Sequence, residues 1–138
     1  MNKKRNEELI KKANDALNNT QLVKIFKDEQ AKNAGIIKDS YNGQTAALGV
    51  TIAMTGLRPA LAIYQKETEG CKRIEILNAI AVMLEIKPQS GKKPGEELFK
   101  KTLQCNAEEL KVYKRDILDC SIALKQVIRT YKLSDNEN

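Results

Sequence analysis

The chain has 138 residues, a length that suits one domain with a single hydrophobic core. Hydrophobic residues make up 41% of it, which excludes the low-hydrophobicity composition of a disordered chain. The net charge of +6, from 24 basic and 18 acidic residues, suits a polyanion or an acidic protein as partner.

Good helix formers dominate the sequence, whereas β-branched and aromatic runs are scarce, so we predict an all-α fold. The first helix is predicted over about residues 4–18, because apolar residues recur there at helical spacing: Leu9, Ile10, Ala13 and Leu17. Thr20 can cap a second helix, which ends near Gly35. Its apolar face is marked by Leu22, Val23 and Phe26.

No residue between Ser40 and Leu57 is charged, which is unusual in a chain that is 30% charged. We therefore expect this run to be the buried centre of the fold. A third helix is predicted from about Asn42 to Thr55, and Gly56 ends it. A short fourth helix should begin at Pro59 and reach about residue 68, with Leu61, Ala62 and Tyr64 facing inward and Lys66 facing outward.

A fifth helix over 72–86 is apolar around most of its circumference, so we expect it to be largely buried. The Pro- and Gly-containing segment 87–95 is a loop signal, and Glu96 and Glu97 favour the start of a sixth helix. Asn106, with Glu109 three residues later, predicts a capping box that opens a long last helix to about Leu133. The predicted architecture is a single-domain bundle of six to seven helices over residues 1–138.

The last helix has an apolar seam at alternating spacings of three and four residues, which predicts packing against the rest of the bundle rather than an intermolecular coiled coil. The seam consists of Leu110, Tyr113, Ile117, Cys120, Leu124, Val127 and Tyr131. Its charged residues are sorted by sign, because at 3.6 residues per turn the basic ones share one arc and the acidic ones another. The acidic arc contains Glu108, Glu109, Asp116 and Asp119.

The basic arc is our candidate nucleic-acid interface, and it forms a stripe roughly 30 Å long at 1.5 Å per residue. The arc contains Lys111, Lys114, Arg115, Lys125, Arg129 and Lys132. The first five are the primary RNA-binding candidates, with Lys11, Lys12, Arg58 and Lys66 as secondary candidates. Leu118 and Ile122 lie inside the arc and away from the seam. They indicate either a docking surface for another protein or a wide apolar face that packs within the chain.

No residue pattern in the sequence indicates catalysis. Histidine is absent, which excludes imidazole bases and histidine-containing zinc sites. Cys71, Cys105 and Cys120 lack metal-ligand spacing and indicate reduced intracellular thiols. A carboxylate metal site is a disfavoured alternative, so we expect neither a metal nor a cofactor. No signal peptide or membrane span is recognised, and we expect a cytoplasmic protein without a membrane partner.

The segment from Gly56-Leu57 through Ala60-Leu61-Ala62-Ile63-Tyr64 to Lys66 resembles a known family. So do the apolar helix from Ile74 to Leu84 and a terminal helix with Tyr113, Ala123-Leu124 and Arg129. Together they are similar to the small subunit of the type III-B CRISPR effector complex, the fifth protein of its RAMP module. The resemblance covers about residues 21–132.

The resemblance implies a non-catalytic helical subunit of an RNA-guided antiviral complex. It implies copies that stack head to tail beside the RAMP backbone subunit and the other effector subunits, along a groove that holds guide and target RNA. The alternative from a different class is a stand-alone helical DNA-binding regulator, in which Thr55-Gly56-Leu57 would be the turn of a helix-turn-helix. The helix after Pro59 offers few base-reading side chains, which disfavours this alternative, and the third class, an enzyme, is disfavoured by the missing chemistry.

Overall fold

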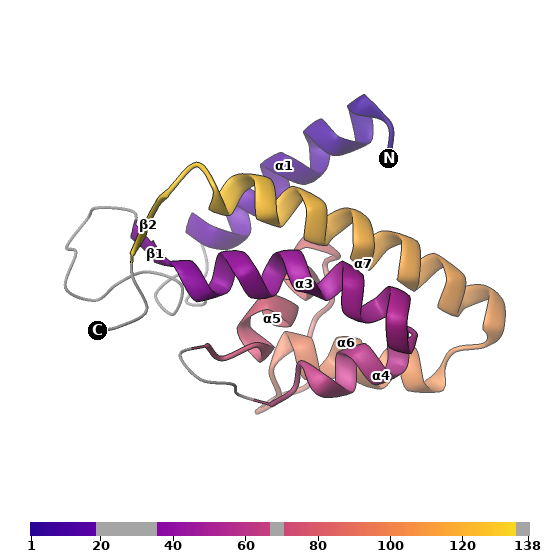
Figure 1. The fold of residues 1–138 in the computed structure, drawn as a ribbon. Helices are drawn as coiled ribbons and strands as arrows, with labels where there is room; N and C mark the ends of the chain where they lie inside the picture. Colours follow the sequence, from indigo (N-terminus) through magenta and orange to yellow (C-terminus); the bar gives the residue numbers. More distant parts are fainter. Residues whose placement is uncertain (19–35, 67–70, 135–138) are drawn as a thin grey trace.

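The computed structural model describes residues 1–18, 36–66 and 71–134. These residues confirm the all-α prediction, since six helices surround one core and only two three-residue strands accompany them. The elements are labelled as in Figure 1: α1 Lys3–Asn18, β1 Ile36–Lys38, α3 Asp39–Thr55, α4 Leu57–Ile63, α5 Ile74–Met83, α6 Pro94–Gln104, α7 Ala107–Ile128 and β2 Lys132–Ser134.

Helix α1 begins one residue before the predicted position and buries the face that its spacing predicts. Leu9, Ala13 and Leu17 are buried there, together with Ala16. The helix packs against α7 and α5. The second predicted helix, from about Thr20 to Gly35, lies outside the described residues.

Helix α3 begins at Asp39, three residues earlier than predicted, and a carboxylate in the first turn favours that start. It ends where Gly56 adopts φ 91°, a left-handed conformation that favours glycine. One face of α3 is buried, formed by Tyr41, Thr45, Leu48 and Ile52. The expectation that the whole uncharged run is buried is wrong, because Val50 is 60% exposed and Met54 80% exposed.

Helix α4 starts at Leu57 and ends at Ile63, so the predicted extension to about residue 68 is wrong. Pro59 is its third residue, still within the first turn, where an N–H has no partner inside the helix. Tyr64 is buried and its hydroxyl donates to the backbone carbonyl of Gln44 at 2.6 Å, which fastens the end of α4 to α3. Leu61 also faces inward as predicted, whereas Ala62 is exposed.

Helix α5 is the centre of the bundle, as its apolar circumference predicts, and it contacts α1, α6 and α7. Every residue of it except Val82 is buried. Two of those residues are polar: Asn78 accepts from the backbone N–H of Gly95 at 2.7 Å and donates to the Glu75 carboxylate at 3.1 Å. These bonds fix the start of α6 against α5 and satisfy polar groups that would be costly to bury alone.

Helices α3 and α7 lie side by side, and α1 covers another side of α7 (Figure 1). Helix α7 ends at Ile128, about five residues before the predicted end. The chain then turns into β2, which pairs in parallel with β1 in the register Ile36 to Lys132, Ile37 to Leu133 and Lys38 to Ser134. This pairing holds the start of α3 beside the end of α7.

Candidate nucleic-acid interface

Helix α7 owes its start to the predicted capping box. The Asn106 side chain accepts from the backbone N–H of Glu109 at 2.9 Å, and the Glu109 carboxylate accepts from the N–H of Asn106 at 3.2 Å. Both bonds satisfy helix-terminal donors that lack a partner inside the helix. The apolar seam is buried from Ile117 to Val127, so the prediction of packing within the bundle is confirmed.

The basic arc of α7 divides into two lines when its residues are placed on the helix. The outward line contains Lys111, Arg115 and Arg129, which are all exposed, with Ile122 between them at 40% exposure. The side chain of Lys111 is 77% exposed and that of Arg115 is 63% exposed. Long cationic side chains on one exposed line can follow the phosphates of a nucleic acid without reading its bases.

The inward line of the arc contains Lys114, Leu118 and Lys125, which follow one another at spacings of four and seven residues. Leu118 is half-buried against α3, because a Cβ built on Gly49 would lie 3.7 Å from Leu118 Cδ2. This contact identifies the line that borders α3. The pair Leu118 and Ile122 is therefore divided: Leu118 packs partly within the chain, and Ile122 faces solvent.

Two residues of the outward line have polar neighbours that limit where their guanidinium groups can go. Arg115 donates to the Asp116 carboxylate from Nε at 3.2 Å and from Nη2 at 3.1 Å. Arg129 donates from Nε to Asn42 Oδ1 at 3.3 Å, at the start of α3. Lys111 lies 3.7 Å from the Glu108 carboxylate, an exposed pair of the kind that contributes little to stability.

The acidic arc of α7 is occupied by a residue that the sequence analysis did not single out. Arg5 of α1 contacts Asp116 at 2.7 Å and Asp119 at 2.8 Å. The hydrogen bond to Asp119 is the largest influence that raises the pKa of Arg5 above its usual value. The separation of acidic and basic residues on α7 therefore has a structural role, because α1 packs against the acidic side of the helix and leaves its basic side facing outward.

The secondary candidates lie on other elements. Lys11 and Lys12 are exposed on α1, and Lys66 is exposed in the turn after α4. Arg58 instead donates from Nε to the carbonyl of Thr102 at 2.8 Å and from Nη2 to the carbonyl of Cys105 at 3.2 Å. These bonds satisfy carbonyls at the end of α6, so Arg58 has a structural task at this position.

Among the described residues, no group of three or more histidine, cysteine, aspartate or glutamate side chains could hold a metal ion. Cys71 and Cys120 are buried, and burial raises the pKa of Cys71 to about 11 and that of Cys120 to about 12. A thiol with so high a pKa stays protonated and is a poor nucleophile at neutral pH.

Val50 and Met54 of α3 are exposed apolar residues that the sequence analysis missed. A signal was present, because Gly43, Ala46, Val50 and Ala53 recur at spacings of three and four residues on the side of α3 away from its buried face. After Asp39, both sides of this helix are uncharged, so the absence of charge alone does not tell which side is buried. In the described part of the chain, no helix is long and apolar enough to cross a membrane.

A family model described as CRISPR-associated protein (Cas_Cmr5) matches residues 2–131. Among curated proteins and among solved structures, nothing matches the chain.

Proposed function

Since the chain belongs to the Cas_Cmr5 family, the small subunits of type III-B CRISPR effector complexes, we propose that it lines the guide and target RNA groove of such a complex without catalysing a reaction. The observation that carries this proposal is the outward line of α7, where Lys111 and Arg115 within the helix and Arg129 at its C-cap are exposed on one side. Cations held along a helix neutralise phosphates and release counterions, which gives affinity that does not depend on base sequence.

The proposed partners are guide and target RNA, the RAMP backbone subunit, the other effector subunits and further copies of the chain in the cytoplasm. Ile122 supports a protein contact, since an exposed apolar residue between basic ones suits the centre of a small interface. Leu118 adds to that contact only through its exposed part. A cofactor has no place in this proposal.

The alternative, a DNA-binding regulator, has little support in the geometry. The helix that would read bases is α4, which has seven residues. Its one charged residue, Arg58, points to the end of α6. A recognition helix needs several polar side chains on an exposed face at the major groove, and α4 has none of that kind.

The decisive experiment measures affinity for labelled single-stranded RNA at several salt concentrations. The triple variant Lys111→Glu, Arg115→Glu and Arg129→Glu should bind RNA far more weakly than the wild type. Its plot of log affinity against log salt should flatten by about 2, at about 0.7 for each lost phosphate contact.

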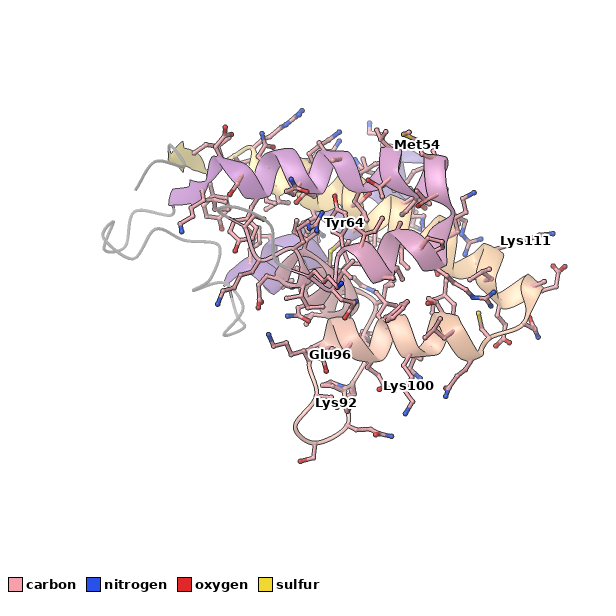
Figure 2. All side chains as sticks on the ribbon, turned by 60° about the horizontal axis from the view of Figure 1, so that its bottom comes forward. Met54, Tyr64, Lys92, Glu96, Lys100 and Lys111 are labelled. Atoms are coloured by element: carbon pink, nitrogen blue, oxygen red, sulfur yellow. The ribbon has the colours of Figure 1, made fainter. Side chains whose placement is uncertain are left out.

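A matched control makes the same change of charge elsewhere. Lys87, Lys92 and Lys100 are exposed on the loop before α6 and on α6, and Lys92 and Lys100 lie on the opposite side of the molecule from Met54 (Figure 2). Replacing all three with Glu should leave most of the RNA affinity intact. Equal losses in both triple variants would refute the assignment to α7 and indicate a general effect of net charge.

A further inference from the structure

The outward side of α3 is exposed and has no charged residue from Gly43 to Met54, whereas Asp39, the exposed first residue of the helix, lies one turn before this stretch. Val50 is 60% exposed and Met54 is 80% exposed, and their spacing of four residues makes them neighbours on the helix. The same side continues through Gly43, Ala46 and Ala53, which are also exposed. We call these five residues the α3 face. Single exposed apolar residues are ordinary, but a continuous uncharged helix side next to the basic arc of α7 indicates an interaction surface.

The two borders of the α3 face differ in charge. On the α7 side lies the inward basic line, where Lys114 is exposed and Lys125 is half-buried. Neither lysine forms an ion pair with any residue that the structure describes. Helix α4 itself, Leu57–Ile63, has one charged residue, Arg58, which is turned to the carbonyls of α6, so α4 adds no outward charge along this border. A partner on the α3 face therefore meets positive charge along one edge only.

We infer that the α3 face docks a helix of another protein, apolar where it contacts Val50 and Met54 and acidic along the edge that lies beside α7. Carboxylates on that edge would pair with Lys114 and Lys125, whereas its opposite edge would lie over α4 and need no charge. The inference rests on the proposed function, because it takes the chain to be one subunit of a larger complex. It uses the inward line, so the outward line stays available to RNA.

Other occupants fit the charges less well. Two copies that met through the same face would bring Lys114 and Lys125 of one copy close to those of the other, and like charges would oppose the contact. RNA would gain little from the uncharged side of α3, because phosphate binding needs cations and this side has no aromatic residue on which bases could stack.

The first test identifies the occupant directly. The photoreactive residue p-benzoylphenylalanine replaces Met54, whose side chain stands out from the end of α3 (Figure 2), and the assembled effector complex is irradiated. Mass spectrometry should find the cross-link on a helix of a different subunit, with aspartate or glutamate along one edge. A cross-link to RNA, to a second copy, or to another part of the same chain would each overturn the inference.

The second test measures incorporation into the effector complex that lacks this subunit. The variant Val50→Ser and Met54→Ser should join about tenfold more weakly or worse, because apolar anchors carry much of an interface. The control Leu103→Ser and Val112→Ser changes apolar residues that are 53% and 47% exposed on α6 and α7, and it should join normally. Equal incorporation of the wild type and the α3 variant would overturn the docking face.

Two further measurements separate this inference from the RNA proposal. The variant Lys114→Glu and Lys125→Glu should lose incorporation, whereas Lys111→Glu, Arg115→Glu and Arg129→Glu should lose RNA affinity. If the α3 variant melts well below the wild type in isolation, the face is covered within the chain and the inference is wrong. If the wild type itself does not join the complex, the proposed function is wrong, and the docking face is refuted with it.

Discussion

Helices α3 and α5 both look like core helices in sequence, yet they have different surroundings. Helix α5 has neighbours on all sides and contains two buried polar residues, Glu75 and Asn78, which bond inside the protein. Helix α3 has no charge after Asp39, yet Val50 and Met54 face solvent. The comparison teaches that the number of neighbouring helices decides burial, and that a helix without charges can still have an exposed side, which on α3 is the side for which we infer a partner.

The largest expected difference between the two helices appears when one large side chain is shortened in each. Leu77→Ala in α5 removes a side chain with no exposed surface, and it should lower the free energy of unfolding by about 2–5 kcal/mol. Met54→Ala in α3 should change it by less than about 0.5 kcal/mol, because the site is exposed. Urea denaturation of the full chain measures both, and similar losses would show that the α3 face is covered in the isolated protein.

Two glycines, one packed against α5 and one in α3, extend the comparison with smaller expected changes in stability. A Cβ at Gly95 would lie 2.7 Å from Asn78 Oδ1 and 3.0 Å from the Asn78 backbone nitrogen, so Gly95→Ala must push α6 away from α5. We expect a loss of about 1–3 kcal/mol.

The matching change in α3 should have the opposite sign. Gly43 has no atom within 4 Å of its Cβ position, and alanine in an exposed helix is favoured over glycine by about 0.5–1 kcal/mol. Both glycine variants are compared by thermal unfolding. A stable Gly95→Ala protein would contradict the close packing of α5 and α6.

The last expected effect is a dependence on pH from the buried thiols. Burial raises the pKa of Cys71 to about 11 and that of Cys120 to about 12. Above about pH 9 the unfolded chain loses these protons while the folded chain keeps them, so the free energy of unfolding falls as pH rises. Between pH 8 and pH 10 we expect a loss of about 1–2 kcal/mol per thiol.

The control for this dependence is the double variant Cys71→Ala and Cys120→Ala, whose stability should vary less with pH over the same range. The range ends at pH 10 because burial also raises the pKa of Tyr64 and of Tyr113. An unchanged slope in the double variant would show that other groups cause the loss.

What could be predicted from the sequence depended on how far apart the interacting residues are. The capping box of Asn106 and Glu109 spans three residues, and the structure has it as predicted. The hydrogen bond from Arg5 to Asp119 joins residues 114 positions apart, and no local sequence pattern predicts it. The parallel pairing of β1 with β2 was also missed, because the two strands lie far apart in the sequence and each has only three residues.

The candidate site shows the same limit. Helical spacing placed the basic residues of α7 on one arc, but it could not tell which line of that arc borders another helix. The contact of Leu118 with Gly49 settles this, and it depends on the arrangement of α3 and α7 in space. Likewise, the sequence offered Arg58 as a cation for RNA, whereas the fold brings it to the carbonyls of Thr102 and Cys105.

The pairing of Arg5 with Asp116 and Asp119 has a consequence for how the protein approaches its partners. Arg5 places one positive charge against the two carboxylates of Asp116 and Asp119, so it weakens the negative field on this side of α7, whereas the basic arc on the other side keeps its charge. If the outward line binds RNA as proposed, the field of the basic arc turns an approaching polyanion toward the line before contact and raises the rate of productive collisions. Salt shortens the reach of this field to about 10 Å at 0.1 M, so added salt should slow association.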